Sequence, residues 1–396
     1  MARKILMGQK ELLRGKLMAQ VDKKLITLNS ASSQIGVSYR QGKRILAAYR
    51  KGGDAALIHG NVGKTSPKKT DETIRLKALE AYRTRYPDFG PAFATEKLME
   101  VEGIEVSAET LRKWLLSEGL WQRHRKTKEH RSRRERRPCF GDLVQFDGSH
   151  HRWFEGRGVK CCYINMVDDA SGKSLGMFFD EETTEGAMRT LWRWIELYGI
   201  PKALYCDKKN AFVLTREPTD DELRRGIIKP KSHFGKACEK LGIEVIAANS
   251  PQAKGRVERN HQVHQDRLVK ELRLAGISTM EKANEFLEKT YLPKINQKFS
   301  VPPRESGDGH APLLNVDLRE IFCFEYTRSV SNDFVIRHDC RYYQILKENK
   351  NLPRPKDKVT VRIYLDGVVN IYWQGKTLLV KELDKQQYKD HVNNAA

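Results

Sequence analysis

The sequence predicts a multidomain α+β protein with two N-terminal helix-turn-helix units, an α/β core and a small C-terminal β-barrel. Residues 1–121 have the pattern of short helices joined by Gly-containing turns. Residues 140–272 alternate strand and helix patterns after three initial strands, which is typical of a mixed α/β sheet. From about residue 319, five or six short strands follow one another, which favours a small barrel. A chain of 396 residues can hold two to four such domains.

The composition points to a polyanionic partner. The formal net charge is +21, and 31% of the residues are charged. Such an excess of Lys and Arg favours nucleic acid first and an acidic membrane second. No apolar run approaches the length of a membrane span, and the N-terminus lacks the apolar region of a signal peptide. Double-stranded DNA is therefore the expected partner, with no membrane involved.

The cysteines indicate a reducing compartment. There are seven, they form no CxxC pair, and two of them are adjacent. This spacing is typical of neither a disulfide framework nor a zinc knuckle. We expect reduced thiols in a cytoplasmic, bacterial-type protein associated with the nucleoid.

The first unit is expected at residues 1–51. A helix rich in small residues precedes a turn at Gly36, and a basic helix starts after Ser38, which forms a capping box with Gln41. Helix, tight turn and basic helix are the helix-turn-helix pattern, although an ordinary helical hairpin would read the same way. The basic side chains expected to contact DNA are Arg40, Lys43 and Arg44.

The second unit is expected at residues 70–121, after a Gly-rich basic linker at 52–69. Its third helix is capped by Ser107, and its apolar face leaves Arg112 and Lys113 able to meet phosphates. Two such units on one basic linker could follow successive grooves of one duplex.

A basic linker is expected at residues 122–138. Its segment 122–137 has nine Lys or Arg and two Glu, so nine minus two gives a charge of +7. A block this dense repels itself unless it meets phosphates, so we expect it to bind DNA rather than to be only a solvated linker. The candidate phosphate contacts are Arg131, Arg133, Arg134, Arg136 and Arg137.

The α/β core is expected at residues 139–275, interrupted by an inserted loop at 213–231. A helix and a Pro-rich connector should fill 276–318, and the barrel should fill 319–386. Asp366-Gly367 between two barrel strands is a strong hairpin signal.

Three acids of the core could perform chemistry. Asp147 lies within a strand, where aspartate is disfavoured. Asp207 ends a buried strand, and Glu258 lies near the start of a long basic helix, at the margin of its buried face. One acid on each of two strands and a packed helix can converge on two Mg²⁺ ions. Each acid taken alone is more often a turn former or a solvated charge; the combination favours a site.

Other acids of the core are interpreted as structural. Asp168 and Asp169 have the chemistry of a turn. Asp180, Glu181 and Glu182 look like the start of a helix, and further acids fall in the inserted loop.

The segments LVQFDGSHHRWFEGRG, YCDKKNAF and NSPQAKGRVERNHQVHQDRLVKELRL resemble the integrase-type DDE transposases of insertion sequences, particularly the ISNCY type. The resemblance covers about residues 140–310. Lys208-Lys209 follow Asp207 where many integrase-type enzymes have Asn-Gly, and the inserted loop lengthens the spacing to Glu258.

The resemblance implies an RNase H-like core in which Asp147, Asp207 and Glu258 bind two Mg²⁺ ions, with Mn²⁺ as a substitute. It also implies cleavage at the ends of a mobile element, joining of the freed 3′-OH to target DNA, and a homo-oligomer on paired ends. Lys254, Arg256 and Arg259 would position phosphates. A DNA-binding regulator with a catalytically silent core is the main alternative, and a stand-alone ribonuclease H ranks last.

Overall fold

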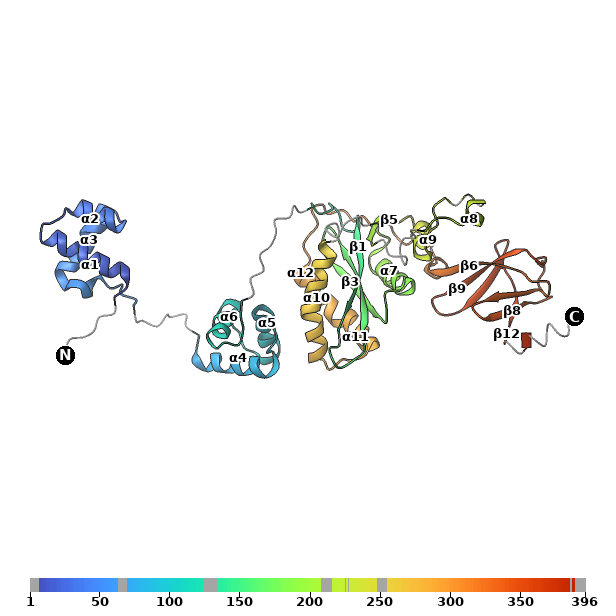
Figure 1. Ribbon diagram of the computed structural model, residues 1–396, viewed down its shortest axis with the longest axis horizontal. Helices are drawn as coiled ribbons and strands as arrows, with labels where there is room; N and C mark the ends of the chain where they lie inside the picture. Colours follow the sequence, from blue (N-terminus) through green and yellow to red (C-terminus); the bar gives the residue numbers. More distant parts are fainter. Residues whose placement is uncertain are drawn as a thin grey trace. The chain divides into compact units, whose positions relative to one another are not determined.

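The computed structural model describes residues 7–62, 70–123, 134–207, 216–224, 226, 228–247, 255–384 and 387–388. The chain divides into two compact units, Met1–Arg123 and His124–Ala396 (Figure 1). Arg131, Arg133 and Lys254 lie outside the described residues. In the described part of the chain, no helix combines the length and the apolar character needed to cross a membrane.

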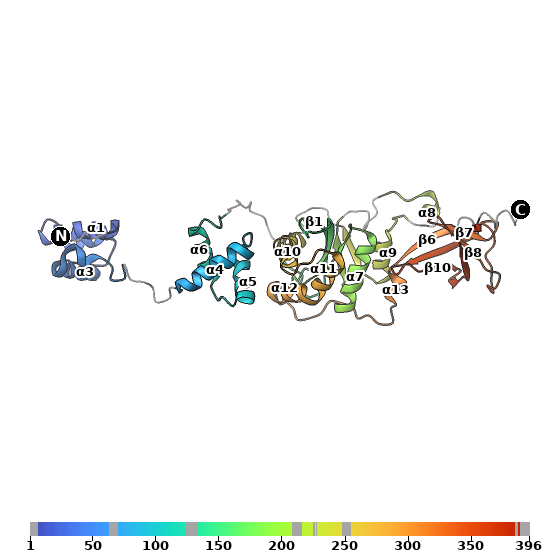
Figure 2. The ribbon, with the colours of Figure 1, turned by 90° about the horizontal axis from the view of Figure 1, so that it is seen from below.

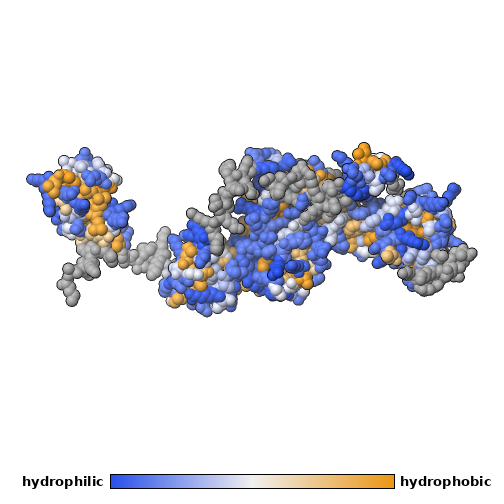
Figure 3. Space-filling model, in the orientation of Figure 1, coloured by the Kyte–Doolittle hydropathy of each residue, from blue (hydrophilic) through white to orange (hydrophobic). Residues whose placement is uncertain are grey.

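The first helical group contains α1 (Gln9–Asp22), α2 (Leu28–Ile35), α3 (Tyr39–Gly52) and a 3-10 turn at Gly53–Leu57. Helix α2 ends at Gly36, whose φ of 75° is easily reached only without a side chain. The Oγ of Ser38 accepts a hydrogen bond from the amide of Gln41 at 3.3 Å and so caps α3, as the sequence predicts. Apolar colour gathers on this group in Figure 3, and its exposed apolar side chains include Leu12, Leu13 and Leu25.

The second helical group contains α4 (Glu72–Arg85), α5 (Pro91–Glu102) and α6 (Ala108–Ser117). Ser107 caps α6 by accepting from the amide of Thr110 at 3.1 Å. The group has a core of its own, formed by ten buried residues that include Tyr82, Phe93 and Leu111. The helices therefore follow the predicted order, while their binding to DNA stays a prediction.

The second unit is built on a five-stranded sheet in the order β3-β2-β1-β4-β5. The strands are β1 (Val144–His151), β2 (Cys161–Asp168), β3 (Ser174–Phe179), β4 (Ala203–Cys206) and β5 (Glu244–Ala247). The first three strands are antiparallel, and β4 and β5 run parallel to β1. The predicted mixed α/β sheet is confirmed, and its strand order fits the RNase H-like core that the resemblance implied.

Helices cover both faces of this sheet. Helices α7 (Thr184–Tyr198) and α9 (His233–Lys240) lie on one face, and α10 (Gly255–Leu274), α11 (Met280–Phe286) and α12 (Leu292–Phe299) lie on the other (Figure 2). A π-helical turn at Leu287–Tyr291 joins α11 to α12. Two short helices, α8 (Asp220–Arg224) and α13 (Leu318–Ile321), complete the unit.

Two asparagines protect the edge strand β3. The side chain of Asn284 donates to the carbonyl of Phe178 and accepts from its amide, and Asn296 makes the same pair of bonds with Ser174. These bonds satisfy backbone groups that an edge strand leaves open to another chain. The segment 276–318, expected to be a helix and connector, thus belongs to the packing of the sheet, and Leu287 and Tyr291 lie in its core.

The C-terminal strands form two small sheets, and no closed barrel is found among the described residues, so the predicted small barrel is not confirmed. One sheet has the order β11-β10-β9-β6 and the other β12-β8-β7. The strands are β6 (Cys323–Ser329), β7 (Val335–His338), β8 (Arg341–Ile345), β9 (Lys358–Tyr364), β10 (Val369–Trp373), β11 (Lys376–Thr377) and β12 (Val380–Leu383).

The two sheets share one apolar core, to which Ile336 and Tyr343 contribute from one sheet and Val361 and Ile371 from the other. Strand β11 has two residues and β7 has four, and each is the edge strand of its own sheet. The predicted hairpin at Asp366-Gly367 joins β9 to β10, and Gly367 has a φ of 83°.

Candidate active site

Asp147 and Asp207 lie at matching positions of neighbouring parallel strands. Strand β1 pairs with β4 so that Val144 faces Leu204 and Gln145 faces Tyr205. Each aspartate stands two residues beyond the second pair, and adjacent strands are about 4.8 Å apart. Both aspartates are half-buried. The register therefore places the two residues side by side, where β4 ends.

The pairing explains why an aspartate is tolerated within β1. On one side, β1 is paired with β2 along its whole length, so that Asp147 faces Asn165. On the other side, β4 ends at Cys206, so the position beside Asp147 is no longer covered by a strand. Asp147 therefore lies where β1 continues past the end of its parallel neighbour.

Helix α10 crosses the face of the sheet that carries Asp147. Alternate residues of β1 point to the same face. Gln145 accepts from the amide of Val257 at 3.1 Å, and Ser149 accepts from the side chain of Gln265 at 3.1 Å. Asp147, which lies between Gln145 and Ser149 on β1, shares this face. The eight steps of helix from Val257 to Gln265 rise about 12 Å, which is close to the length of the four steps of strand from Gln145 to Ser149.

Glu258 lies in the first turn of α10 and is exposed. The helix is held on either side of it, by the bond of Val257 to Gln145 and by a bond of 2.8 Å from Asn165 to Asn260. Since Asn165 is the cross-strand partner of Asp147, Glu258 is fixed above the same region of the sheet.

The three acids stand on β1, at the end of β4 and on α10, which packs on β1. Over the described ranges, Asp147, Asp207 and Glu258 are not gathered with their oxygens all within 4.8 Å of one another. Like charges repel, so such a group closes only around cations that neutralise it. The segments 208–215 and 248–254, which adjoin Asp207 and Glu258, lie outside the described residues.

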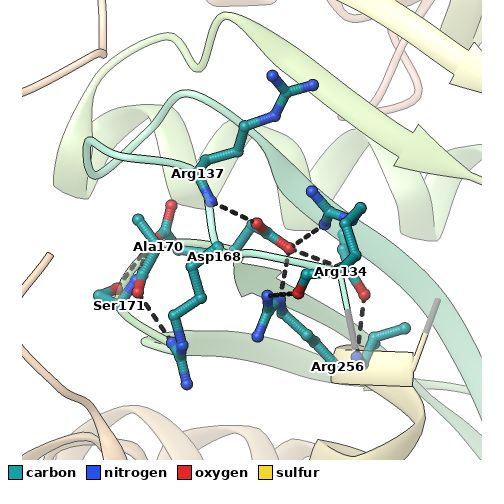
Figure 4. Close-up of polar contacts among 10 residues, drawn as sticks. Arg134, Arg137, Asp168, Ala170, Ser171 and Arg256 are labelled. Carbon is teal, nitrogen blue, oxygen red and sulfur yellow. Dashed lines mark hydrogen bonds and ion pairs between the residues drawn. The ribbon is translucent and has the colours of Figure 1, made fainter. Parts of the chain in front are cut away.

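A buried carboxylate, Asp169, anchors the start of α10 by binding Arg134, Arg137 and Arg256, which Figure 4 labels. Its Oδ1 accepts from Arg134 at 2.5 Å, from Arg256 at 2.7 Å and from Gln145 at 3.0 Å. Its Oδ2 accepts from the amide of Arg137 at 2.8 Å. Gln145 thus connects Asp169 to the amide of Val257, one residue before Glu258. Asp169 fixes the position of the helix that carries the third acid.

The interpretation of the Asp168-Asp169 pair as turn formers holds for Asp168 and is incomplete for Asp169. Asp168 accepts from the amide and hydroxyl of Ser171, at 2.6 and 2.7 Å, and from the amide of Gly141 at 3.0 Å. Burial raises the pKa of Asp168, and these hydrogen bonds oppose the rise. Both side chains are completely buried. The sequence carried no sign that Asp169 would collect two distant arginines.

Several predicted DNA contacts have partners within the protein. Arg256 is bound to Asp169 and has a side chain 24% exposed, whereas that of Arg134 remains 48% exposed. Arg136 donates to the carbonyl of Ala170 at 2.8 Å, and burial followed by the charge of Arg256 lowers its pKa. Arg112 is paired with Glu109 on its own helix at 2.6 Å. The described predicted contacts that are exposed are Arg40, Lys43, Arg44, Lys113, Arg134, Arg136, Arg137 and Arg259.

Two curated proteins are similar to nearly the whole chain. The putative transposase y4bF of Sinorhizobium fredii is 36% identical over 392 residues, which cover 98% of this chain and 84% of the relative. The transposase for insertion sequence IS1202 of Streptococcus pneumoniae is 30% identical, over 90% of this chain and 83% of that protein. The chain belongs to this family of transposases. No family model matches it.

Solved structures of viral integrases overlap the transposase weakly. The catalytic core of HTLV-2 integrase, solved with magnesium, is 21% identical and covers 40% of this chain and 88% of its own, with a TM-score of 0.30. A simian T-cell lymphotropic virus intasome is 16% identical and covers 76% of this chain and 97% of its own, with a TM-score of 0.35.

Proposed function

We propose that this transposase binds the ends of a mobile element and catalyses metal-dependent cleavage and strand transfer of DNA. One observation carries the proposal: the register of β1 and β4 sets Asp147 beside Asp207, below the helix that carries Glu258. The similarity to transposases along 98% of the chain supports the same reaction class.

The donor set fits magnesium. Asp147, Asp207 and Glu258 offer carboxylate oxygens, which are the ligands that Mg²⁺ prefers, and Mn²⁺ accepts the same set. These residues would hold two ions. When bound, the ions supply activation of the attacking oxygen and charge stabilisation of the leaving oxygen. Because neighbouring strands are about 4.8 Å apart, Asp147 and Asp207 would be close enough to hold an ion together.

The basic residues would place the DNA. Exposed Arg259 follows Glu258 directly, and with Lys254 it would hold phosphates near the acids. Arg256 would act through Asp169, by fixing the start of α10. The helical groups, with exposed Arg40, Lys43, Arg44 and Lys113, would recognise the element ends. Pairing of two ends would use a homo-oligomer.

The test is Asp207→Asn in the full chain. We expect cleavage and joining of end DNA in Mg²⁺ to be lost, because Asn removes the anionic ligand while keeping the shape. Binding of end DNA in the absence of metal should stay within about twofold, since phosphate and base contacts lie elsewhere. The matched control is Asp266→Asn, which removes an exposed acid of α10 paired with Lys270. Cleavage by Asp207→Asn at the wild-type rate would show that Asp207 is not a ligand.

The alternative is a DNA-binding regulator with a silent core. It shares the charge and the helical groups, and the presence of all three acids argues against it. Wild-type protein that binds end DNA but does not nick it in Mg²⁺ or Mn²⁺ would favour the regulator.

A further inference from the structure

A second group of potential ligands lies on the opposite face of β1. The described residues contain one cluster whose His, Cys and carboxylate ligand atoms all lie within 4.8 Å of one another: His150, Cys162 and Glu182. The Nε2 of His150 is 3.9 Å from the Oε2 of Glu182. From this cluster we infer that the transposase has a site for one transition-metal ion of the Zn²⁺ class, separate from the acidic site.

The backbone prearranges these side chains. His150 and Cys162 are cross-strand partners in the β1–β2 ladder, so both project from the same face. That face alternates with the face of Asp147 and Ser149, which α10 covers. Glu182 precedes α7, whose helix packs on β2 and β3. The ladder and the start of α7 thus bring three different ligand types together.

Gly148 makes room for the carboxylate. A Cβ added at Gly148 would stand 2.6 Å from the Cδ of Glu182 and 2.8 Å from its Oε2. The absence of a side chain therefore lets Glu182 lie against β1. The side chain of Glu182 is 5% exposed, that of His150 is 60% exposed, and Cys162 is buried. The site is closed from the protein side and reached from solvent past His150.

The donor types select the metal. An imidazole nitrogen, a thiolate sulfur and a carboxylate oxygen form a set typical of Zn²⁺, whereas Mg²⁺ prefers oxygen alone. Three protein ligands leave a fourth position for water in tetrahedral coordination. Zinc ligands stand about 3.5 Å apart when the bonds are about 2.0–2.3 Å long, so a small rotation of His150 closes the present spacing. Binding would deprotonate the thiol and release a proton.

The site would brace the strand that carries Asp147. His150 and Gly148 follow Asp147 on β1, and the ion would tie this strand to β2 and to the start of α7. This role is structural, and it does not depend on the proposed function.

The experiment is a Co²⁺ titration of the chelator-treated full chain. We expect one equivalent to give a thiolate-to-cobalt charge-transfer band, Zn²⁺ to abolish it, and excess Mg²⁺ to leave it. Co²⁺ bound by the carboxylates of the acidic site gives no sulfur band, so the two sites are distinguished.

The variants assign the sulfur. Cys162→Ser should remove the band, while Cys161→Ser, a change at the adjacent buried cysteine, should keep it. His150→Ala and Glu182→Gln should each weaken Co²⁺ binding at least tenfold. Circular dichroism of Cys162→Ser checks that this variant is folded. If it is not, the tenfold weaker Co²⁺ binding expected of His150→Ala, a change at an exposed position, decides the question. No sulfur band in the wild type, or a band that survives Cys162→Ser, would overturn the inference.

Discussion

Asp169 shows how one buried charge can set the geometry of a site that it does not enter. Its carboxylate accepts bonds from Arg134 and Arg256, and from the side chain of Gln145, which also holds the amide of Val257. Removing the charge would leave two guanidinium groups without a buried anion.

We therefore expect Asp169→Asn to lower the free energy of unfolding of the unit His124–Ala396 by about 2–3 kcal/mol, below the range for fully buried pairs because both arginines remain partly exposed to solvent. Urea unfolding of the full chain measures this. The control is Glu285→Gln, which removes an exposed acid paired with Lys289 and should leave the unfolding midpoint in place. An unchanged unfolding midpoint in Asp169→Asn would show that Arg134 and Arg256 can be solvated without a loss of stability.

His264 gives the core a dependence on pH. Its Nδ1 is 3.0 Å from the hydroxyl of Tyr291, and its ring contacts that of Tyr163. Burial, followed by the nearby charge of His261, lowers the pKa of His264 to about 3. In the unfolded chain its pKa is about 6.5. The stability that neutral His264 supports is therefore complete above about pH 6.5 and is lost as the pH falls from there toward 3.

We expect the free energy of unfolding of the wild type to fall between about pH 7 and pH 5 by about 2 kcal/mol more than that of His264→Gln, because only the wild-type unfolded state gains this proton. Urea titrations at the two pH values give the comparison. His59→Gln, at an exposed histidine of the first unit, should keep the wild-type difference. Equal losses of stability in His264→Gln and the wild type would mean that His264 is protonated in the folded state.

At the scale of helices and strands, local sequence signals predicted the individual elements well. They did not predict how the C-terminal strands assemble into sheets. Gly36 specifies a turn through its backbone conformation and Ser38 specifies a cap through its side-chain hydroxyl, so α2 and α3 could be placed from a few residues. The C-terminal strands were also expected, but their assembly into two sheets depends on hydrogen bonds between strands that are distant in sequence. The sequence of a short edge strand does not indicate on which side the strand will remain unpaired.

The same limit applies to the site. Asp147 and Asp207 could be proposed because each is unusual for its strand, and the ladder of β1 and β4 then sets them side by side. The hydrogen bonds of Asp169 reach residues that are separated from it by 24, 35 and 87 positions in the sequence. No sequence spacing predicts these contacts. The proposed ligands His150, Cys162 and Glu182 could not be grouped from the sequence, because they are three ordinary residues with no metal-binding spacing.

Helix α6 allows folding and binding to be separated. Leu111 is fully buried in the core of the second helical group, and Lys113 on the same helix is exposed. We expect Leu111→Ala to destabilise this group by about 2–5 kcal/mol through the cavity it leaves. Lys113→Ala should leave the unfolding midpoint unchanged. It should weaken binding of end DNA and of DNA of other sequences by the same factor, since a lysine–phosphate interaction carries no sequence information.

Thermal unfolding and filter binding on the two variants check this pair. Unchanged DNA affinity in Lys113→Ala would remove α6 from the proposed interface and leave its role structural.

At the scale of the molecule, the acids and the proposed recognition residues belong to different compact units. Asp147, Asp207 and Glu258 all lie in His124–Ala396, whereas the exposed basic residues of the helical groups lie in Met1–Arg123. The basic segment 122–137 joins the two. Its described end is fixed to the core through Arg134, Arg136 and Arg137. The described end of this segment is therefore structural, and binding of DNA by the rest of it stays a prediction.

This division predicts different consequences for neighbouring arginines. Arg131→Gln with Arg133→Gln should weaken binding of all DNA sequences alike and make its salt dependence shallower, by up to about 0.9 in log–log slope for each phosphate that the protein no longer neutralises. The unfolding midpoint of the second unit should not change. Arg134→Gln should lower that midpoint, because it removes a partner of buried Asp169. Its effect on the salt slope should not exceed that of one phosphate.

Salt titration of DNA binding and urea unfolding, performed on the wild type and both variants, separate the two halves. The relative preference for one end sequence should survive in both variants, because phosphate contacts position the DNA and base contacts specify it. An unchanged salt slope in the double variant would make residues 131 and 133 part of a solvated linker. An unchanged midpoint in Arg134→Gln would mean that Arg256 and Gln145 hold Asp169 without it, and that Arg134 is available for DNA.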